Sequence, residues 1–170
     1  MRAWSTAYTF LLLVMFATCI TVDAIPGAGT PVRELLQLKL TAGWNPPPSI
    51  AIILSIAANN TLHSVWPLTL GLLDLQARRW TRSLADALVI ANLVVPGVLV
   101  GSALGAYGPR TLSYLPHVPV ELAGIAVGAA GWIIERDRPL SGRERAIGIG
   151  VSMAVLLVAA SVEAYLVPHR

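Results

Sequence analysis

Residues 85–107 read ADALVIANLVVPGVLVGSALGAY, a long and almost wholly apolar stretch. A transmembrane helix needs about 20 mostly apolar residues, because each residue rises about 1.5 Å and the hydrocarbon core is about 30 Å thick. This stretch has that length. It therefore predicts a helix that crosses a lipid bilayer.

The composition of the whole chain agrees with that prediction. Apolar residues make up 55% of the 170 residues and charged residues 12%, whereas an average soluble domain has roughly 25% charged residues. Too few charges are present to cover a soluble surface, and too little chain remains for a soluble catalytic domain. Cys19 is the single cysteine, which excludes an internal disulfide and a paired-cysteine metal site.

Four other stretches have the length of a span, so we predict an all-α, polytopic membrane helix bundle in a single domain, residues 1–170. The five predicted spans lie at about residues 4–22, 50–72, 85–107, 118–134 and 146–167. The first span has an alternative interpretation as a signal peptide, because Arg2 precedes an apolar core and residues 22–24 loosely resemble a cleavage site. Cleavage would leave four spans in the same orientation.

The basic residues between the spans predict the topology, because Lys and Arg stay preferentially on the cytoplasmic side. One side holds eight of them: Arg2, Arg78, Arg79, Arg82, Arg136, Arg138, Arg143 and Arg145. The other side holds four: Arg33, Lys39, Arg110 and Arg170. We therefore expect the N-terminus inside and the C-terminus outside.

The loop between the first two spans contains a second kind of helix. Residues 31–40 (PVRELLQLKL) place Val32, Leu35, Leu36 and Leu40 at helical spacing. We expect this amphipathic segment to lie along the outer membrane surface. The three prolines at 46–48 then end it.

Glycines at four-residue spacing predict where helices pack closely, since small residues let helix backbones approach in lipid. They are Gly97, Gly101 and Gly105 in the third span and Gly124 and Gly128 in the fourth. The short link at 108–116 suggests that these spans are antiparallel neighbours, so we predict a contact between Gly101 and Gly124. The alternative is that glycine is simply common in membrane helices.

Ionisable residues inside a span need a partner or a purpose, because each costs about 3 kcal/mol by insertion scales. His117 and Glu121 share a helical face at the outer end of the fourth span, and Glu163 reaches the same depth in the fifth. Helix capping and pairing is one interpretation, and a proton or cation site is the other. A histidine with two carboxylates could bind a metal, but ligand spacing this loose is only a weak signal, and we predict no metal site.

A second polar group lies near the middle of the bilayer. It consists of Asn59, Asn60 and His63 in the second span and Asn92 in the third, with His63 and Asn92 at nearly equal depth. Such side chains usually bridge neighbouring helices. The competing interpretation is a midplane transport site, since Pro67 and Pro96 interrupt the same two spans.

Residues 115–123 (LPHVPVELA), with the glycine-rich residues 124–131, resemble the stage II sporulation protein M family. Residues 58–60, Asn92 with Gly97 and Gly101, and residues 162–168 agree in order and spacing, so the resemblance covers roughly residues 50–168. It implies a multi-pass membrane protein. In spore-forming bacteria the family's namesake works in a complex with peptidoglycan-degrading partners.

These observations lead us to expect a non-enzymatic scaffold or complex subunit in the cell membrane. Its expected partners are the lipid bilayer and other membrane or envelope proteins, and a homo-oligomer is possible. We expect no nucleic acid, no cofactor and no metal. Nucleotide-binding loops and nucleophile elbows are absent from the sequence. The alternative is a small transporter or ion-conducting protein that uses His63 and Asn92 midway and Glu121 and Glu163 at the outer mouth.

Overall fold

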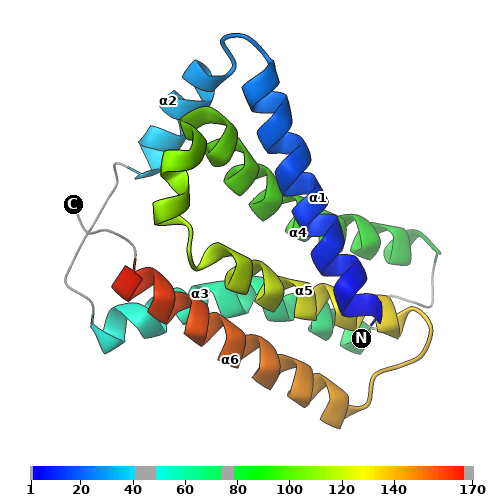
Figure 1. Cartoon of the computed structure of the whole chain (residues 1–170). Helices are drawn as coiled ribbons and strands as arrows, with labels where there is room; N and C mark the ends of the chain where they lie inside the picture. Colours follow the sequence, from blue (N-terminus) through cyan, green and yellow to red (C-terminus); the bar gives the residue numbers. More distant parts are fainter. Residues whose placement is uncertain (1, 41–48, 74–78, 167–170) are drawn as a thin grey trace.

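The computed structural model describes residues 2–40, 49–73 and 79–166 (Figure 1). Across these ranges the regular structure is helical throughout and no strand is found, so the predicted all-α fold is confirmed. The elements are α1 (Arg2–Ala24), α2 (Gly29–Leu40), α3 (Ile50–Thr69), η1 (Leu70–Leu73), α4 (Arg79–Tyr107), η3 (Gly108–Tyr114), α5 (Val118–Glu135) and α6 (Gly142–Leu166).

Four of these helices are long and apolar enough to cross a membrane, which indicates a multi-pass membrane protein. They are α1, α4, α5 and α6, the last over Gly142–Tyr165. The second predicted span, residues 50–72, corresponds to α3, which has 20 residues but is not among the four. The polar side chains of Asn59, Asn60 and His63 lower its hydropathy.

Local interactions explain where two of the helices begin. Ser49 caps α3, and its hydroxyl accepts a hydrogen bond from the Ile52 amide at 3.3 Å. Ser141 and Glu144 form a capping box, in which the Glu144 amide donates to the Ser141 hydroxyl at 3.2 Å and the Ser141 amide donates to the Glu144 carboxylate at 2.9 Å. This box explains why α6 begins at Gly142, ahead of the apolar run predicted from residue 146.

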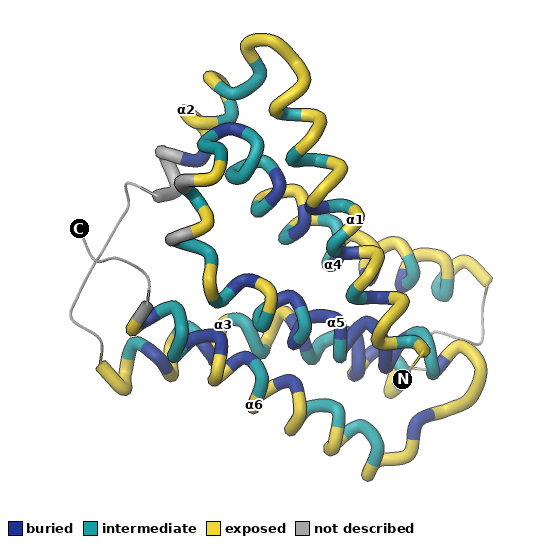
Figure 2. Tube along the Cα trace, in the orientation of Figure 1, coloured by how far each residue is buried: buried dark blue, intermediate teal, exposed yellow. Residues whose placement is uncertain are grey.

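The helices form two groups that lie side by side at one end and diverge at the other (Figure 1). Helices α3, α5 and α6 pack against one another in the first group. Helix α1 packs along α4 in the second, with α2 against α4, and α1 also crosses α5. Helix α5 is the most buried of the four candidate spans and lies at the centre (Figure 2).

Large apolar side chains cover the outer faces of the bundle. Leu13 is 63% exposed and Ile20 67% exposed on α1, and Val95 and Val158 are exposed on α4 and α6. Together with helices long and apolar enough to cross a membrane, these exposed side chains indicate a protein that is embedded in lipid.

The glycines of α4 pack against α1, so the predicted contact between Gly101 and Gly124 is wrong. A Cβ added to Gly101 would meet the backbone carbonyl oxygen of Met15, and one added to Gly105 would lie 2.6 Å from that of Cys19. One added to Gly97 would lie 3.0 Å from the Val14 side chain.

The glycines of α5 face the other group of helices. A Cβ at Gly124 would lie 2.7 Å from the Leu156 side chain of α6, and one at Gly128 would meet the Ser64 carbonyl of α3. The short link after α4 folds as the 3-10 helix η3 and carries the chain away from α4 before α5 begins (Figure 1). Proximity in sequence therefore did not make these glycine faces neighbours.

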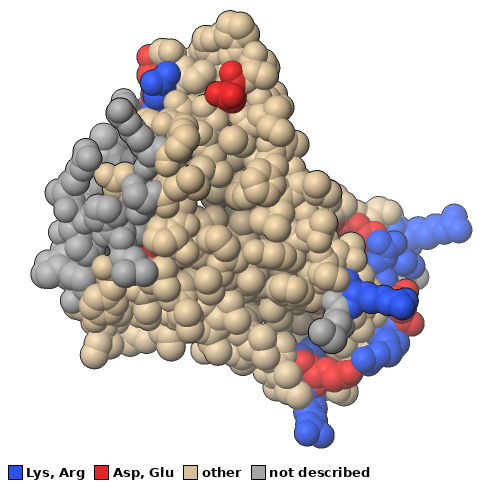
Figure 3. Space-filling model, in the orientation of Figure 1, with Lys and Arg blue, Asp and Glu red and all other residues tan. Residues whose placement is uncertain are grey.

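Arginines gather at the end of the bundle where α4 and α6 begin and α5 ends (Figure 3). The segment predicted at 31–40 forms most of α2, where Leu36 is buried and Leu35 is 59% exposed. Several sequence predictions concern Arg78, Arg170 and the prolines at 46–48, which lie outside the described residues. The side chains of Lys39 and Arg110 also lie outside the description.

Candidate functional site

The structure brings His117, Glu121 and Glu163 together, and we call this group the outer cluster. His117 is the N-cap residue of α5, Glu121 lies in the first turn of α5, and Glu163 lies near the end of α6. The His117 Nε2 atom lies 3.9 Å from the nearest carboxylate oxygen of Glu121 and 3.9 Å from that of Glu163. The sequence-based grouping of these three residues therefore matches the geometry.

The outer cluster joins the ends of two helices. Its distances exceed the range of about 2.7–3.2 Å for a hydrogen bond from nitrogen to oxygen, so the contacts are ion pairs whenever His117 is protonated. The His117 side chain makes no capping hydrogen bond, and its buried Nδ1 atom has no partner in the described structure. Glu121 lies where the positive end of the α5 dipole favours a carboxylate.

Metal coordination does not match the geometry of the described residues. Zinc is bound by histidine and carboxylate ligands at about 2.0–2.2 Å. Among residues 2–40, 49–73 and 79–166, no group of three His, Cys, Asp or Glu side chains is placed to hold a metal ion. The outer cluster is therefore a set of titratable groups between two helices.

Asn92 of α4 bridges α4 to α3 in the middle of the bundle. Its side-chain amide donates to the backbone carbonyl of His63 at 3.2 Å, and its carbonyl oxygen accepts from the Trp66 indole at 3.1 Å. Both neighbours lie on α3. This is the arrangement expected of a polar residue that holds two helices together.

The other polar residues of α3 are placed differently. The Asn59 amide donates to the Asn60 side chain at 3.4 Å on the same helix. Asn59 and His63 are exposed, and His63 meets Asn92 through its backbone and not through its imidazole. The four predicted midplane residues therefore do not converge on one site.

A serine node, which the sequence analysis missed, joins α3, α5 and α6. Ser64 and Ser152 have no exposed surface, and their hydroxyl oxygens lie 2.6 Å apart. Both hydroxyls also reach the Gly124 carbonyl, Ser64 at 2.6 Å and Ser152 at 3.4 Å. Serine is common in membrane helices, so the sequence does not single out Ser64 and Ser152. They are identified by the packing of Gly124 against α6.

A buried tryptophan joins α4 to α5. The Trp132 indole is 2% exposed and donates to the Asp86 carboxylate at 2.9 Å. Arg136 lies 3.7 Å from the other oxygen of Asp86. The sequence-based predictions did not include Asp86, although it is a charged residue within the predicted span at 85–107.

A buried ion pair closes the hairpin between α5 and α6. Arg145 donates to Glu135, whose side chain also accepts from the Leu140 amide at 3.4 Å. Glu135 is 6% exposed. A Cβ at Gly71 of η1 would overlap the Glu135 carboxylate, so a larger residue there would displace that side chain. In the sequence, Glu135 and Arg145 stand on either side of a short link between two predicted spans, which could have predicted this ion pair.

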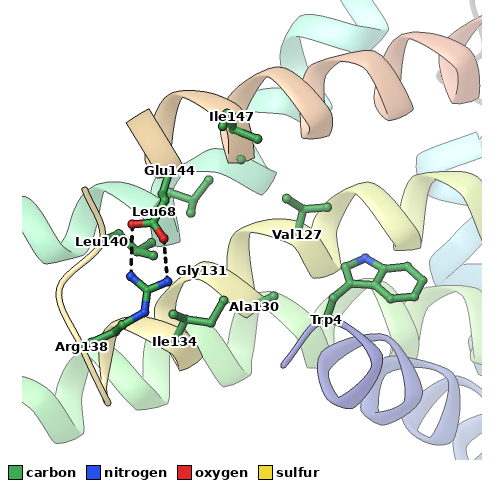
Figure 4. A pocket seen from close by; sticks show the side chains of 11 residues that line it. Trp4, Leu68, Val127, Ala130, Gly131, Ile134, Arg138, Leu140, Glu144 and Ile147 are labelled. Carbon is green, nitrogen blue, oxygen red and sulfur yellow. Dashed lines mark hydrogen bonds and ion pairs between the residues drawn. The ribbon is translucent and has the colours of Figure 1, made fainter. Parts of the chain in front are cut away.

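An apolar cleft of about 270 Å³ lies at the same end of the bundle (Figure 4). Leu68, Val127 and Ile147 contribute to its walls, and Trp4 lies at one end. At the other end Arg138 donates to both oxygens of Glu144, at 2.6 and 3.1 Å. These hydrogen bonds and the carboxylate charge raise the pKa of the Arg138 guanidinium above its ordinary value.

No family model, no curated protein and no solved structure matches this chain.

Proposed function

We propose that this chain is a five-span membrane protein, with its N-terminus inside and its C-terminus outside, that acts as a non-enzymatic scaffold or complex subunit in the cell envelope. The observation that carries the proposal is that polar groups deep in the bundle are engaged in hydrogen bonds between helices. Their role is then to fix the arrangement of the helices. A bundle fixed in this way presents a constant surface to partner proteins.

In this proposal helix α3 is a membrane span in addition to α1, α4, α5 and α6. It packs against α5 and α6, which both have the length and composition of membrane spans. Ser64 of α3 shares the serine node with those two helices. A helix held between two spans at that depth crosses the same hydrocarbon layer.

The hydrogen bonds support a scaffold over a transporter. A midplane transport site needs polar groups directed at a substrate path. Instead, the Asn92 side chain is hydrogen-bonded to α3, and the hydroxyls of Ser64 and Ser152 donate to the carbonyl of Gly124. Moving these helices past one another would break several bonds at once.

The resemblance to the stage II sporulation protein M family supports the same role. The stretch that carries it, residues 115–131, contributes His117 and Glu121 to the outer cluster and Gly124 to the serine node. We propose that the chain, like the namesake of that family, holds partner proteins at the envelope. The proposal does not extend to sporulation.

The topology is tested with single cysteines in a Cys19→Ser background and a membrane-impermeant maleimide on intact cells. Ser49 and Leu73 flank α3 and are both exposed. We expect Ser49→Cys to be labelled from outside and Leu73→Cys only after permeabilisation. Labelling of both on one side would show that α3 does not cross.

The scaffold role is tested by isolating the tagged chain from native membranes in mild detergent. We expect defined partner proteins in constant ratio to the chain. The control is a tagged α-helical membrane protein of unrelated sequence, expressed at the same level. Recovery of the chain with lipid and no partner protein would refute the scaffold role while leaving the topology intact.

A small proton- or cation-conducting protein is the second candidate, and the outer cluster favours it. His117 lies at equal distance from two carboxylates on different helices, an arrangement that can pass a proton between them. Reconstituted vesicles should then show a flux that Glu121→Gln and Glu163→Gln each reduce. Vesicles with no flux of protons or cations would remove this candidate.

A further inference from the structure

One face of α3 carries polar side chains that are exposed and that the other described helices do not cover. Ser55, Asn59 and His63 are four residues apart and therefore share a helical face; we call them the α3 stripe. All three are exposed. Helices α5 and α6 cover the opposite face, where Ile53 and Ala57 are buried.

The α3 stripe differs from three hydroxyl residues on other helices. The hydroxyls of Thr18, Thr21 and Ser161 donate to backbone carbonyls four residues earlier on their own helices. Asn59 has a single hydrogen bond, to Asn60, and the His63 imidazole has none within the described ranges. The amide and the imidazole therefore keep unused donors and acceptors.

Unused polar groups in a span are costly, because hydrocarbon offers no hydrogen bonds. If α3 crosses the bilayer, as the proposed function requires, the α3 stripe faces either lipid or another helix. A neighbouring helix with polar groups at the same depth would satisfy it. Within the described residues, no other helix bonds a side chain of the stripe, and Asn92 of α4 reaches only the His63 backbone and the neighbouring Trp66 indole.

We propose that the α3 stripe docks a second copy of this chain, α3 against α3, about a two-fold axis perpendicular to the membrane. Two copies inserted in one orientation have parallel α3 helices, so each residue meets its own counterpart at equal depth. Carboxamide, neutral imidazole and hydroxyl groups each donate and accept. The stripe is therefore complementary to itself, and a second copy supplies partners at the right depth without further requirements.

The residues beside the stripe permit close approach. Ala51 and Ala58 are exposed on the same side of α3, and small side chains let parallel helices come together in lipid. Leu62, four residues after Ala58 on the same side, is 70% exposed and can pack against its counterpart. A polar residue within an apolar helix seam also fixes the register of the pair.

Disulfide cross-linking in native membranes tests the proposal. In a Cys19→Ser background, Ser55→Cys and Asn59→Cys place single thiols on the stripe. Val158→Cys is the matched control, because Val158 is 55% exposed on α6, away from the stripe. We expect a covalent dimer from the two stripe variants after mild oxidation and only background dimer from Val158→Cys.

A second measurement avoids introduced thiols. The Asn59→Leu/His63→Leu variant should have a dimer dissociation constant about tenfold higher in detergent, because interhelical polar contacts stabilise association by about that factor. The fraction of dimer is followed by mass measurement. Its monomer should still fold, because neither side chain bonds another helix. Val158→Leu should dimerise like the original chain.

Three outcomes would overturn the proposal. They are no dimer from either stripe variant, equal dimer from Val158→Cys, and a cross-link from Asn59→Cys to a different protein. The last would replace the second copy by another partner and leave the scaffold role standing. Failure of the proposed topology is seen separately, through labelling of Ser49→Cys and Leu73→Cys on one side.

Discussion

The hydroxyl oxygens of Ser64 in α3 and Ser152 in α6 lie 2.6 Å apart, although 88 residues separate them in the sequence. Both hydroxyls reach the carbonyl of Gly124 in α5, which ties three helices at one point. Gly128, one turn further along α5, lies directly against the backbone of Ser64. Small residues and hydroxyls thus act together, because the hydrogen bonds need the close approach that glycine permits.

A double-mutant cycle on the serine node should give a measurable coupling. Ser64→Ala and Ser152→Ala each remove one hydroxyl, and their combined effect on the unfolding free energy in detergent should deviate from additivity by about 0.6–1.7 kcal/mol. Ser161→Ala is the control, since the Ser161 hydroxyl bonds its own helix at Leu157. Strict additivity of Ser64→Ala with Ser152→Ala would contradict the node.

Glycine substitutions should separate crowded positions from open ones. Gly101→Ala should lower the unfolding free energy by about 1–3 kcal/mol, because the new methyl group overlaps the Met15 backbone of α1 and the helices must move apart. Gly150→Ala is the matched control, as nothing lies within 4 Å of its added Cβ. Equal melting temperatures for the two variants would show that α1 does not pack there, as cleavage of the first span would require.

The sequence was sufficient to locate the helices but not to pair them. Apolar length located α1, α3 and α5 to within a few residues, since hydrocarbon thickness constrains each helix by itself. Four-residue spacing correctly marks Gly97, Gly101 and Gly105 as one face. Which helix meets that face depends on the path of η3, and no local rule fixes that path.

The buried ion pair of Glu135 and Arg145 gives a third prediction. Glu135→Ala should cost about 3–5 kcal/mol of unfolding free energy, because it leaves the Arg145 guanidinium buried without its partner. Gly71→Ala should have a similar effect by displacing the Glu135 carboxylate. Gly142→Ala, whose added Cβ meets nothing within 4 Å, is the control.

Replacing both charges distinguishes a buried pair from a general loss of packing. Glu135→Leu/Arg145→Met should recover most of the stability that Glu135→Ala loses, since an apolar pair of similar volume is often neutral or better. Thermal unfolding in detergent measures all four variants. A double variant that is less stable than Glu135→Ala would contradict the interpretation.

The candidate site shows the same division between what is local and what is not. His117, Glu121 and Glu163 were grouped correctly because depth in the membrane is counted along each helix from its end. Asp86 and Trp132 were not paired, since their contact depends on how α4 crosses α5. His63 was placed at the depth of Asn92 correctly, but the rotation of α3 directs its imidazole outward.

Asn92 distinguishes the proposed scaffold from a transporter with a midplane site, because it is a bridge between helices in the first and a transport residue in the second. Asn92→Leu removes the bonds to the His63 carbonyl and the Trp66 indole, and as a bridge it should lower the unfolding free energy by about 1–2 kcal/mol. Asn60→Leu is the control, because the Asn60 side chain bonds only Asn59 on its own helix within the described structure. Stability is measured by thermal unfolding in detergent and flux in reconstituted vesicles. A variant with unchanged stability and abolished flux would favour conduction over the scaffold, since a transport residue contributes to the path of the substrate and not to the join between helices.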